Sequence, residues 1–145
     1  MAIEFRLIAD PDTTEYRTVR TASQAYTVGD VVDQDRTSDA IDVVPSTASS
    51  ITAAIYGVCM QTIVSTATSM DICLLSPRQR WSADTTNASN TNHNYQRMIL
   101  TDKGTVNNTG TDVAGSTGVF QQLGILGATS ANRIVGRFLP GMIEA

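Results

Sequence analysis

Lysine, glutamate and histidine are nearly absent from this sequence. Lys103 is the only lysine among 145 residues, His93 is the only histidine, and there are three glutamates beside eleven aspartates. The net charge is −4 and the isoelectric point is about 4.7. Nonspecific binding of DNA or RNA needs a clustered basic face, which the scattered arginines do not form. We therefore expect no nucleic-acid partner.

Long apolar runs are missing as well. The longest uninterrupted runs contain only a few residues, whereas a membrane-spanning helix needs about 20. The first residues show no basic segment followed by an apolar one, so we expect no signal peptide and no membrane partner. In a protein that is not exported, Cys59 and Cys73 are expected to be buried, reduced thiols.

Groups for catalysis or metal binding are scarce. A zinc site needs several histidines or cysteines at suitable spacing, and one histidine with two separated cysteines does not supply it. No glycine-rich phosphate loop occurs. Asp33, Asp35 and Asp39 lack the central glycine and distal glutamate of a calcium loop, which leaves either a solvated acidic loop or an incidental cation site. We expect no enzyme activity, no cofactor and no resident metal.

Polar positions are filled instead by 20 threonines, 12 serines and 7 asparagines. These residues favour strands and turns over helices. Alternating apolar residues between turn signals predict about eight to ten short strands. We therefore expect an all-β fold, namely a small β-barrel, a β-tulip or a sandwich, with residues 16–145 in a single domain.

Two hairpins can be assigned within that fold. Residues 55–64 are apolar on both faces, which predicts a long central strand covered on both sides, and residues 70–75 return beside it. Residues 120–126 and 133–139 form the second predicted hairpin. No exact internal repeat is evident.

Two polar stretches, 85–94 and 105–118, contain few apolar residues that could pack. They predict two long exposed loops, and we expect both to lie at one end of the domain.

The N-terminal segment 1–15 allows two interpretations. Its apolar residues alternate with polar ones, as in a strand. The segment either pairs within the chain's own sheet or forms an extended arm that adds a strand to the free sheet edge of a neighbouring molecule. Trp81, flanked by Arg80, is likewise either a half-buried strand aromatic or an interface anchor. The candidate interface residues are Ile3, Phe5, Leu7, Arg80 and Trp81.

Four segments occur in a recognisable order along the chain. They are Ala25-Tyr26-Thr27-Val28-Gly29-Asp30-Val31-Val32, Tyr56-Gly57-Val58-Cys59, Arg80-Trp81-Ser82-Ala83-Asp84-Thr85-Thr86-Asn87, and the closing pair Phe120-Gln121-Gln122-Leu123-Gly124-Ile125 and Arg133-Ile134-Val135-Gly136-Arg137-Phe138. In this order, over roughly residues 25–138, they resemble the head decoration (capsid cement) proteins of tailed bacteriophages.

The resemblance implies a small β-barrel or β-tulip domain that binds the outer surface of an assembled capsid. Such proteins sit as trimers at three-fold positions or as dimers across two-folds, bridge neighbouring major capsid subunits and resist the pressure of packaged DNA. The implied partners are the phage major capsid protein and further copies of this chain. The implied location is the virion, after synthesis in the cytoplasm of the host bacterium. The family has no catalytic residues to carry over.

Two other functions stay open. One is a different virion structural module, such as a head-fibre base, a minor capsid protein or a tail protein. The other is a carbohydrate-binding β-sandwich in which Trp81, Tyr95 and the Asn-rich loop 85–94 form a sugar platform. Glycan binding would favour the sugar platform, whereas a trimer in solution would favour decoration.

Overall fold

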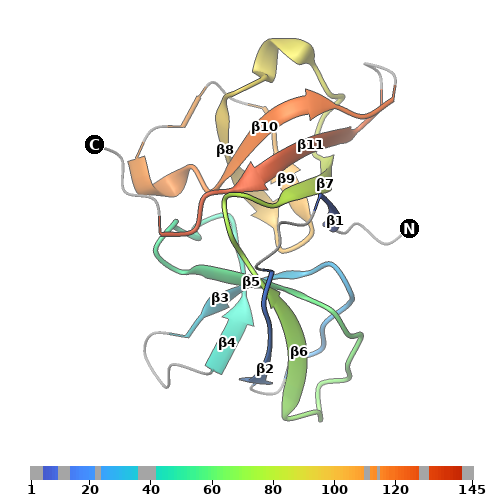
Figure 1. The fold of residues 1–145 in the computed structure, drawn as a ribbon, viewed down its shortest axis with the longest axis vertical. Helices are drawn as coiled ribbons and strands as arrows, with labels where there is room; N and C mark the ends of the chain where they lie inside the picture. Colours follow the sequence, from blue (N-terminus) through green and yellow to red (C-terminus); the bar gives the residue numbers. More distant parts are fainter. Residues whose placement is uncertain are drawn as a thin grey trace.

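The computed structural model describes residues 5–9, 14–21, 24–35, 42–109, 112–113, 115–127 and 131–141 (Figure 1). The strands are β1 (Arg6–Ala9), β2 (Tyr16–Thr21), β3 (Val31–Gln34), β4 (Asp42–Pro45), β5 (Ile55–Cys59), β6 (Ser69–Leu74), β7 (Arg80–Thr85), β8 (Arg97–Asp102), β9 (Thr105–Asn107), β10 (Phe120–Ile125) and β11 (Arg133–Phe138). Two short 3-10 helices are η1 (Thr91–His93) and η2 (Gly115–Thr117), and the described residues contain no α-helix. The all-β prediction is confirmed.

Strands β2–β6 form a first barrel that closes on itself. They follow the order β2-β4-β3-β5-β6, and β6 returns to pair with β2. Neighbours are antiparallel except for β2 and β4, which are parallel. Closure gives each of these strands two partners, which removes the free edges that an open sheet would have.

Strands β7–β11 form a second barrel with the same topology. Here β7 pairs parallel with β9 and antiparallel with β11, and the remaining neighbours β9–β8, β8–β10 and β10–β11 are antiparallel. Strands β7 to β11 therefore have the same order and relative directions in the second barrel as β2 to β6 have in the first. The sequence analysis placed residues 16–145 in one β domain, and the structure divides this range into two barrels of like connectivity.

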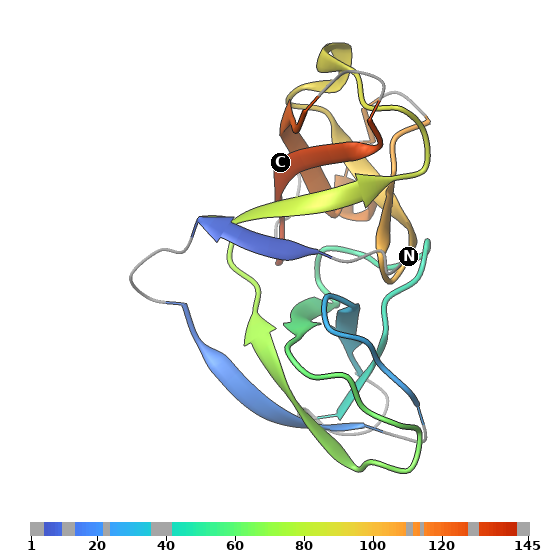
Figure 2. The same cartoon turned by 90° about the vertical axis from the view of Figure 1, so that its right-hand side faces the viewer.

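Strand β1 is an addition to the second barrel. It pairs antiparallel with β7, with Arg6 opposite Ser82 and Leu7 opposite Trp81. Figure 2 shows β1 crossing the molecule between the two barrels. The described part of the N-terminal segment is thus a strand of the chain's own sheet, one of the two interpretations that the sequence left open.

One core joins the two barrels. Side chains alternate between the two faces of a strand, so a strand of the first barrel that is covered on both faces can supply two cores. The residues that face the second barrel are Val31, Val58 and Cys73, and their neighbours inside the first barrel are Val32, Cys59 and Ile72. The prediction that β5 is covered on both sides is confirmed. The predicted strand over 55–64 is too long, because β5 ends at Cys59 and Met60 is exposed.

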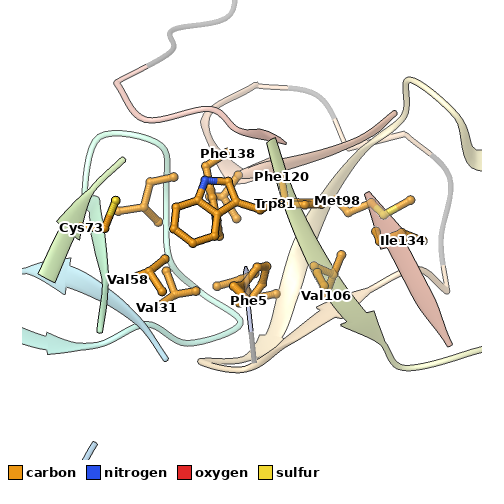
Figure 3. Close-up of a cluster of buried hydrophobic side chains, with 14 residues drawn as sticks. Phe5, Val31, Val58, Cys73, Trp81, Met98, Val106, Phe120, Ile134 and Phe138 are labelled. Carbon is orange, nitrogen blue, oxygen red and sulfur yellow. The ribbon is translucent and has the colours of Figure 1, made fainter. Parts of the chain in front are cut away.

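An aromatic cluster lies at the centre of this shared core (Figure 3). It consists of Phe5, Trp81, Phe120 and Phe138, whose ring centroids are 4.8 to 5.8 Å apart in the contacting pairs. The Trp81 indole N–H donates to Gln79 Oε1 over 3.2 Å, and Gln79, in the linker between β6 and β7, is itself fully buried. Burying each such ring contributes on the order of 1.5–3 kcal/mol, so this cluster is a main source of stability.

A polar contact also connects the barrels. Lys103, in the turn between β8 and β9, lies 3.1 Å from the buried carboxylate of Asp30 and 5.7 Å from the centre of the Tyr26 ring. The Lys103 carbonyl accepts a hydrogen bond from the Val31 amide at 2.8 Å. The only lysine of the sequence therefore fixes a turn of the second barrel on the first.

Replacing Lys103 by methionine should destabilise the protein by about 2 kcal/mol, because the Asp30 carboxylate would remain buried without its counter-charge. Urea unfolding measures the change. The control is Arg20→Met, which removes the ion pair between Arg20 and Asp42. The Arg20 side chain is 52% exposed, so this substitution should lower the free energy of unfolding by at most about 1 kcal/mol. Equal losses in the two variants would contradict a role for Lys103 in joining the barrels.

Candidate functional site

The candidate interface residues fall into three groups. Phe5 and Trp81 are 2% and 1% exposed, respectively, and belong to the shared core, where they stabilise this chain. Arg80 is half-buried, and its guanidinium donates to the carbonyl oxygens of the linker residues Pro77, Arg78 and Gln79. Leu7 is half-buried at the rim of a groove. Ile3 lies outside the described residues.

That groove lies between the two barrels. It has a volume of about 380 Å³ and its lining is predominantly apolar. The second sheet contributes Phe5, Leu7 and Trp81, and the first barrel and the segments beside it contribute Tyr16, Val28, Val58, Cys59, Met60 and Cys73. We call this hollow the junction groove. It draws on residues that are far apart in the sequence, so sequence reasoning identified only Phe5, Leu7 and Trp81 among them.

Exposed apolar side chains gather along this groove. Six large apolar residues of the described chain are exposed, and three of them, Tyr16, Val28 and Met60, line the junction groove. A second hollow of about 370 Å³ shares Tyr16 and Met60 and extends over Arg17 and Asp71 of β2 and β6. The surface is thus apolar at the junction and polar where it continues over the first barrel. Clustered exposed apolar groups mark protein or ligand contacts more often than scattered ones do.

Two cysteines line the groove. Cys59 and Cys73 are both buried and form no disulfide, as the sequence predicted. Burial, with a smaller contribution from the nearby Asp30 carboxylate, raises the pKa of the Cys59 thiol to about 12. Since the thiolate is the nucleophile, Cys59 is inert at neutral pH. His93 lies in η1 beside β10, away from this groove.

The acidic stretch that begins at Asp33 in β3 forms no metal site within the described chain. No group of three or more histidine, cysteine or acidic side chains lies close enough to hold an ion in that part of the protein. The Asp33 carboxylate accepts hydrogen bonds from Ser46 and Ser50 at 2.6 and 2.5 Å. Burial outweighs these two hydroxyls and raises the pKa of Asp33. Asp39 lies outside the described residues. In the same described part of the chain, no helix has the length and apolar character needed to span a bilayer.

The polar stretches 85–94 and 105–118 are each anchored by buried polar side chains within their described residues. Asn108 is 1% exposed, and its side-chain amide donates to the Asn87 and Ala88 carbonyls and accepts from the Asn87 amide. Ser89 is buried, and its amide and hydroxyl both donate to the Ala131 carbonyl, at 2.8 and 2.6 Å. The predicted exposure of 85–94 is confirmed for most of that stretch, and hydrogen bonds between side chains and backbone hold its buried residues. The loop predicted over 105–118 was wrong at its start, because Thr105–Asn107 form strand β9.

Tyr95 follows this packed region and is the most exposed large apolar residue of the described chain, at 70%. Its φ of 70° lies in the left-handed region, which is unfavourable for a side chain of this size. The backbone is held there by two hydrogen bonds, from its amide to the Gln122 carbonyl and from Gln121 Nε2 to its carbonyl. The predicted sugar platform required Trp81 beside Tyr95 at the surface, and Trp81 is buried.

Replacing Tyr95 by glycine should leave the free energy of unfolding unchanged or raise it by up to about 1 kcal/mol. Glycine adopts a positive φ without the cost of roughly 1–2 kcal/mol that other residues meet, which offsets its greater freedom in the unfolded chain. The matched control is Tyr16→Gly, also at an exposed tyrosine but in strand β2, which should lose about 1 kcal/mol or more. Chemical denaturation measures the free energy of unfolding of both variants. An equal decrease in that free energy for Tyr95→Gly and Tyr16→Gly would contradict the prediction.

The two cysteines should not react with Ellman's reagent in the folded protein at pH 8, whereas both should react after unfolding in guanidinium. With a pKa of about 12, roughly one Cys59 in ten thousand is a thiolate at that pH, against about a quarter in an unfolded chain. The measurement is the absorbance of the released thionitrobenzoate. Labelling of the folded protein within minutes would show that the junction groove opens to solvent.

Comparisons with known proteins were made for the whole chain. No protein-family model matches it, and no curated protein matches it. The groove, the edge strand beside it and the buried polar contacts are the features of this structure from which a function is argued.

Proposed function

We propose that this chain is a capsid decoration (cement) protein of a tailed bacteriophage. It binds the outer surface of the head, bridges neighbouring major capsid subunits and stabilises the mature shell against the pressure of packaged DNA. The observation that carries the proposal is the junction groove, an apolar surface between two β-barrels. Such a surface suits contact with another protein.

The placement of the segments that resemble decoration proteins supports this function. Residues 25–32 lead into β3, residues 56–59 lie in β5, residues 80–87 contain β7, and the closing pair forms the β10–β11 hairpin. The resemblance therefore falls on strands that build both barrels.

The mechanical character of the fold is a second support. The two barrels share one core and are further joined by Lys103, so they form one packed unit rather than two independent domains joined by a linker. A body of this kind transmits load between the capsid subunits that it bridges. Many copies act on one shell, so contacts that are weak singly add up.

The other functions have less support. A different virion module would use the same groove, and only its place in the particle would differ. A carbohydrate-binding protein would need an exposed aromatic platform. Trp81, which was expected to be part of that platform, is buried in the core. A trimer at three-fold positions, or a dimer across two-folds, stays a prediction of the resemblance, as do the virion location and the absence of enzyme activity.

The purified chain should co-sediment with expanded heads of its phage and not with unexpanded ones, because decoration sites form as the shell rearranges. The pellet is quantified by gel densitometry across a concentration series. Heads saturated with the chain should also withstand a higher temperature before releasing DNA. Absence of binding to either form of the head, or a monomer that binds glycans, would contradict decoration.

A further inference from the structure

Three polar side chains form a row across the outer face of the second barrel. Strands β11, β10 and β8 are neighbours in the sheet (Figure 1), and Gln121 in β10 lies directly opposite Arg137 in β11 and Arg97 in β8. Residues directly opposite each other point to the same face of a sheet. The adjacent residues Phe120 and Phe138 point into the shared core, so the row faces outward. Two guanidiniums therefore share one surface, with a neutral amide between them.

A pocket of about 240 Å³ lies over this row. Its walls come from Thr52 between β4 and β5, from Leu139 after β11 and from the loop 115–118. Thr52 is 2% exposed, and its amide donates to the Ser116 carbonyl at 2.7 Å, which ties the loop to a segment of the first barrel. We call this hollow the arginine pocket. It shares no lining residue with the junction groove.

The two guanidiniums of the arginine pocket differ in their partners. Arg97 Nη2 lies 3.2 Å from Asp112 Oδ2, and the Arg97 backbone amide donates to Asp112 Oδ1 at 2.7 Å. These hydrogen bonds, first from the amide and then from the guanidinium, lower the pKa of Asp112, so its carboxylate is ionised at neutral pH. Arg137 Nε donates to the neutral Gln121 Oε1 at 2.8 Å, and no carboxylate of the described chain forms an ion pair with Arg137. Within the described residues, one positive charge of the pocket therefore has no counter-charge.

The geometry of Arg137 favours a planar oxyanion. Arginine binds carboxylates and phosphates through two parallel N–H bonds. Gln121 occupies the Nε of Arg137, and the two terminal nitrogens have no hydrogen-bond partner in the described chain. Arg137 is half-buried, so an anion at these nitrogens would be less screened by water than on an open surface. The fork of Arg137 is thus available to a ligand.

Charge and size select among the oxyanions. A phosphate dianion would bring two negative charges near the Asp112 carboxylate, whereas a monoanionic carboxylate matches the single uncompensated charge. The volume of about 240 Å³ is below the roughly 300 Å³ at which pockets usually begin to enclose a whole small molecule. The pocket therefore suits one carboxylate group rather than a larger ligand.

We propose that the arginine pocket binds a carboxylate group, which the fork of Arg137 holds and the charge of Arg97 attracts. Two sources present such a group, namely an aspartate or glutamate side chain of a partner protein and a free small carboxylic acid. The site is argued from the row and the pocket alone, so it does not depend on the proposed decoration function.

An NMR titration of the ¹⁵N-labelled chain tests the site. N-acetyl-glutamate methylamide should shift the Arg137 Nε–H and Gln121 side-chain amide signals, with a dissociation constant on the order of 1–10 mM for a single ion pair with its hydrogen bonds. The control probe is N-acetyl-glutamine methylamide, which has the same shape without the charge and should cause no shift. Absence of shifts with the glutamate probe would overturn the proposal, and so would equal shifts with sodium chloride at the same concentration.

Variants of Arg137 separate its charge from its fork. Arg137→Gln should abolish the shift of the Gln121 signals, and Arg137→Lys, which keeps the charge without the planar fork, should bind at least about threefold more weakly than the unmodified chain. The matched control is Arg78→Gln, which removes an exposed arginine outside the pocket and should leave the affinity within twofold. Circular dichroism checks the fold of each variant. Full affinity in Arg137→Gln would overturn the assignment.

The charge argument has its own test, which leaves Arg137 in place. Asp112→Asn removes the negative charge at a side chain that is 46% exposed, so folding should be retained. The affinity for inorganic phosphate should then rise more than the affinity for N-acetyl-glutamate methylamide, because the dianion is relieved of twice the repulsion. An equal or smaller gain for phosphate would overturn the selection of a monoanion by Asp112.

The source of the carboxylate is identified with expanded phage heads. Co-sedimentation of Arg137→Gln that is at least about fivefold weaker than that of Arg78→Gln would assign the pocket to an acidic side chain of the capsid, since a charge-assisted hydrogen bond would be lost. Equal co-sedimentation of the two variants would assign it to a free small carboxylic acid. Failure of the unmodified chain to bind heads overturns decoration but not the pocket, because the titration needs only the purified chain.

Discussion

The shared core between the barrels is the constraint on which the other features of this protein depend. Val31, Val58 and Cys73 face outward from a closed barrel, and they are buried only because the aromatic cluster of the second sheet covers them. Removing that cover would expose apolar residues on three neighbouring strands. The junction groove has one wall on each barrel, so its shape is fixed by the same packing. The shape of the junction groove and the stability of the protein thus both depend on the packing of the two barrels against each other.

The position of β1 follows from how the barrels close. Each barrel satisfies its own five strands, and β1 is left over as a sixth strand on β7. An exposed edge invites uncontrolled pairing with other chains, and proteins usually cover or interrupt it. Here β1 pairs with β7 on one side, and on the other side the Phe5 amide donates to the Gly29 carbonyl beside the first barrel. The sixth strand therefore extends the second sheet and also contacts the first barrel.

The sequence predicted the strands better than their partners. The all-β class, the two hairpins and the double cover of residues 55–59 follow from local alternation, which is visible in the sequence. Two barrels of like topology were not foreseen, because the parallel pairs β2–β4 and β7–β9 join strands that are not consecutive. Phe5 and Trp81 were recognised as apolar contact residues, but hydropathy does not distinguish contact with a partner from contact within the chain. Asn108 and Gln122 are 1% and 0% exposed, and the sequence does not predict their burial, because a buried amide has the same composition as a surface amide.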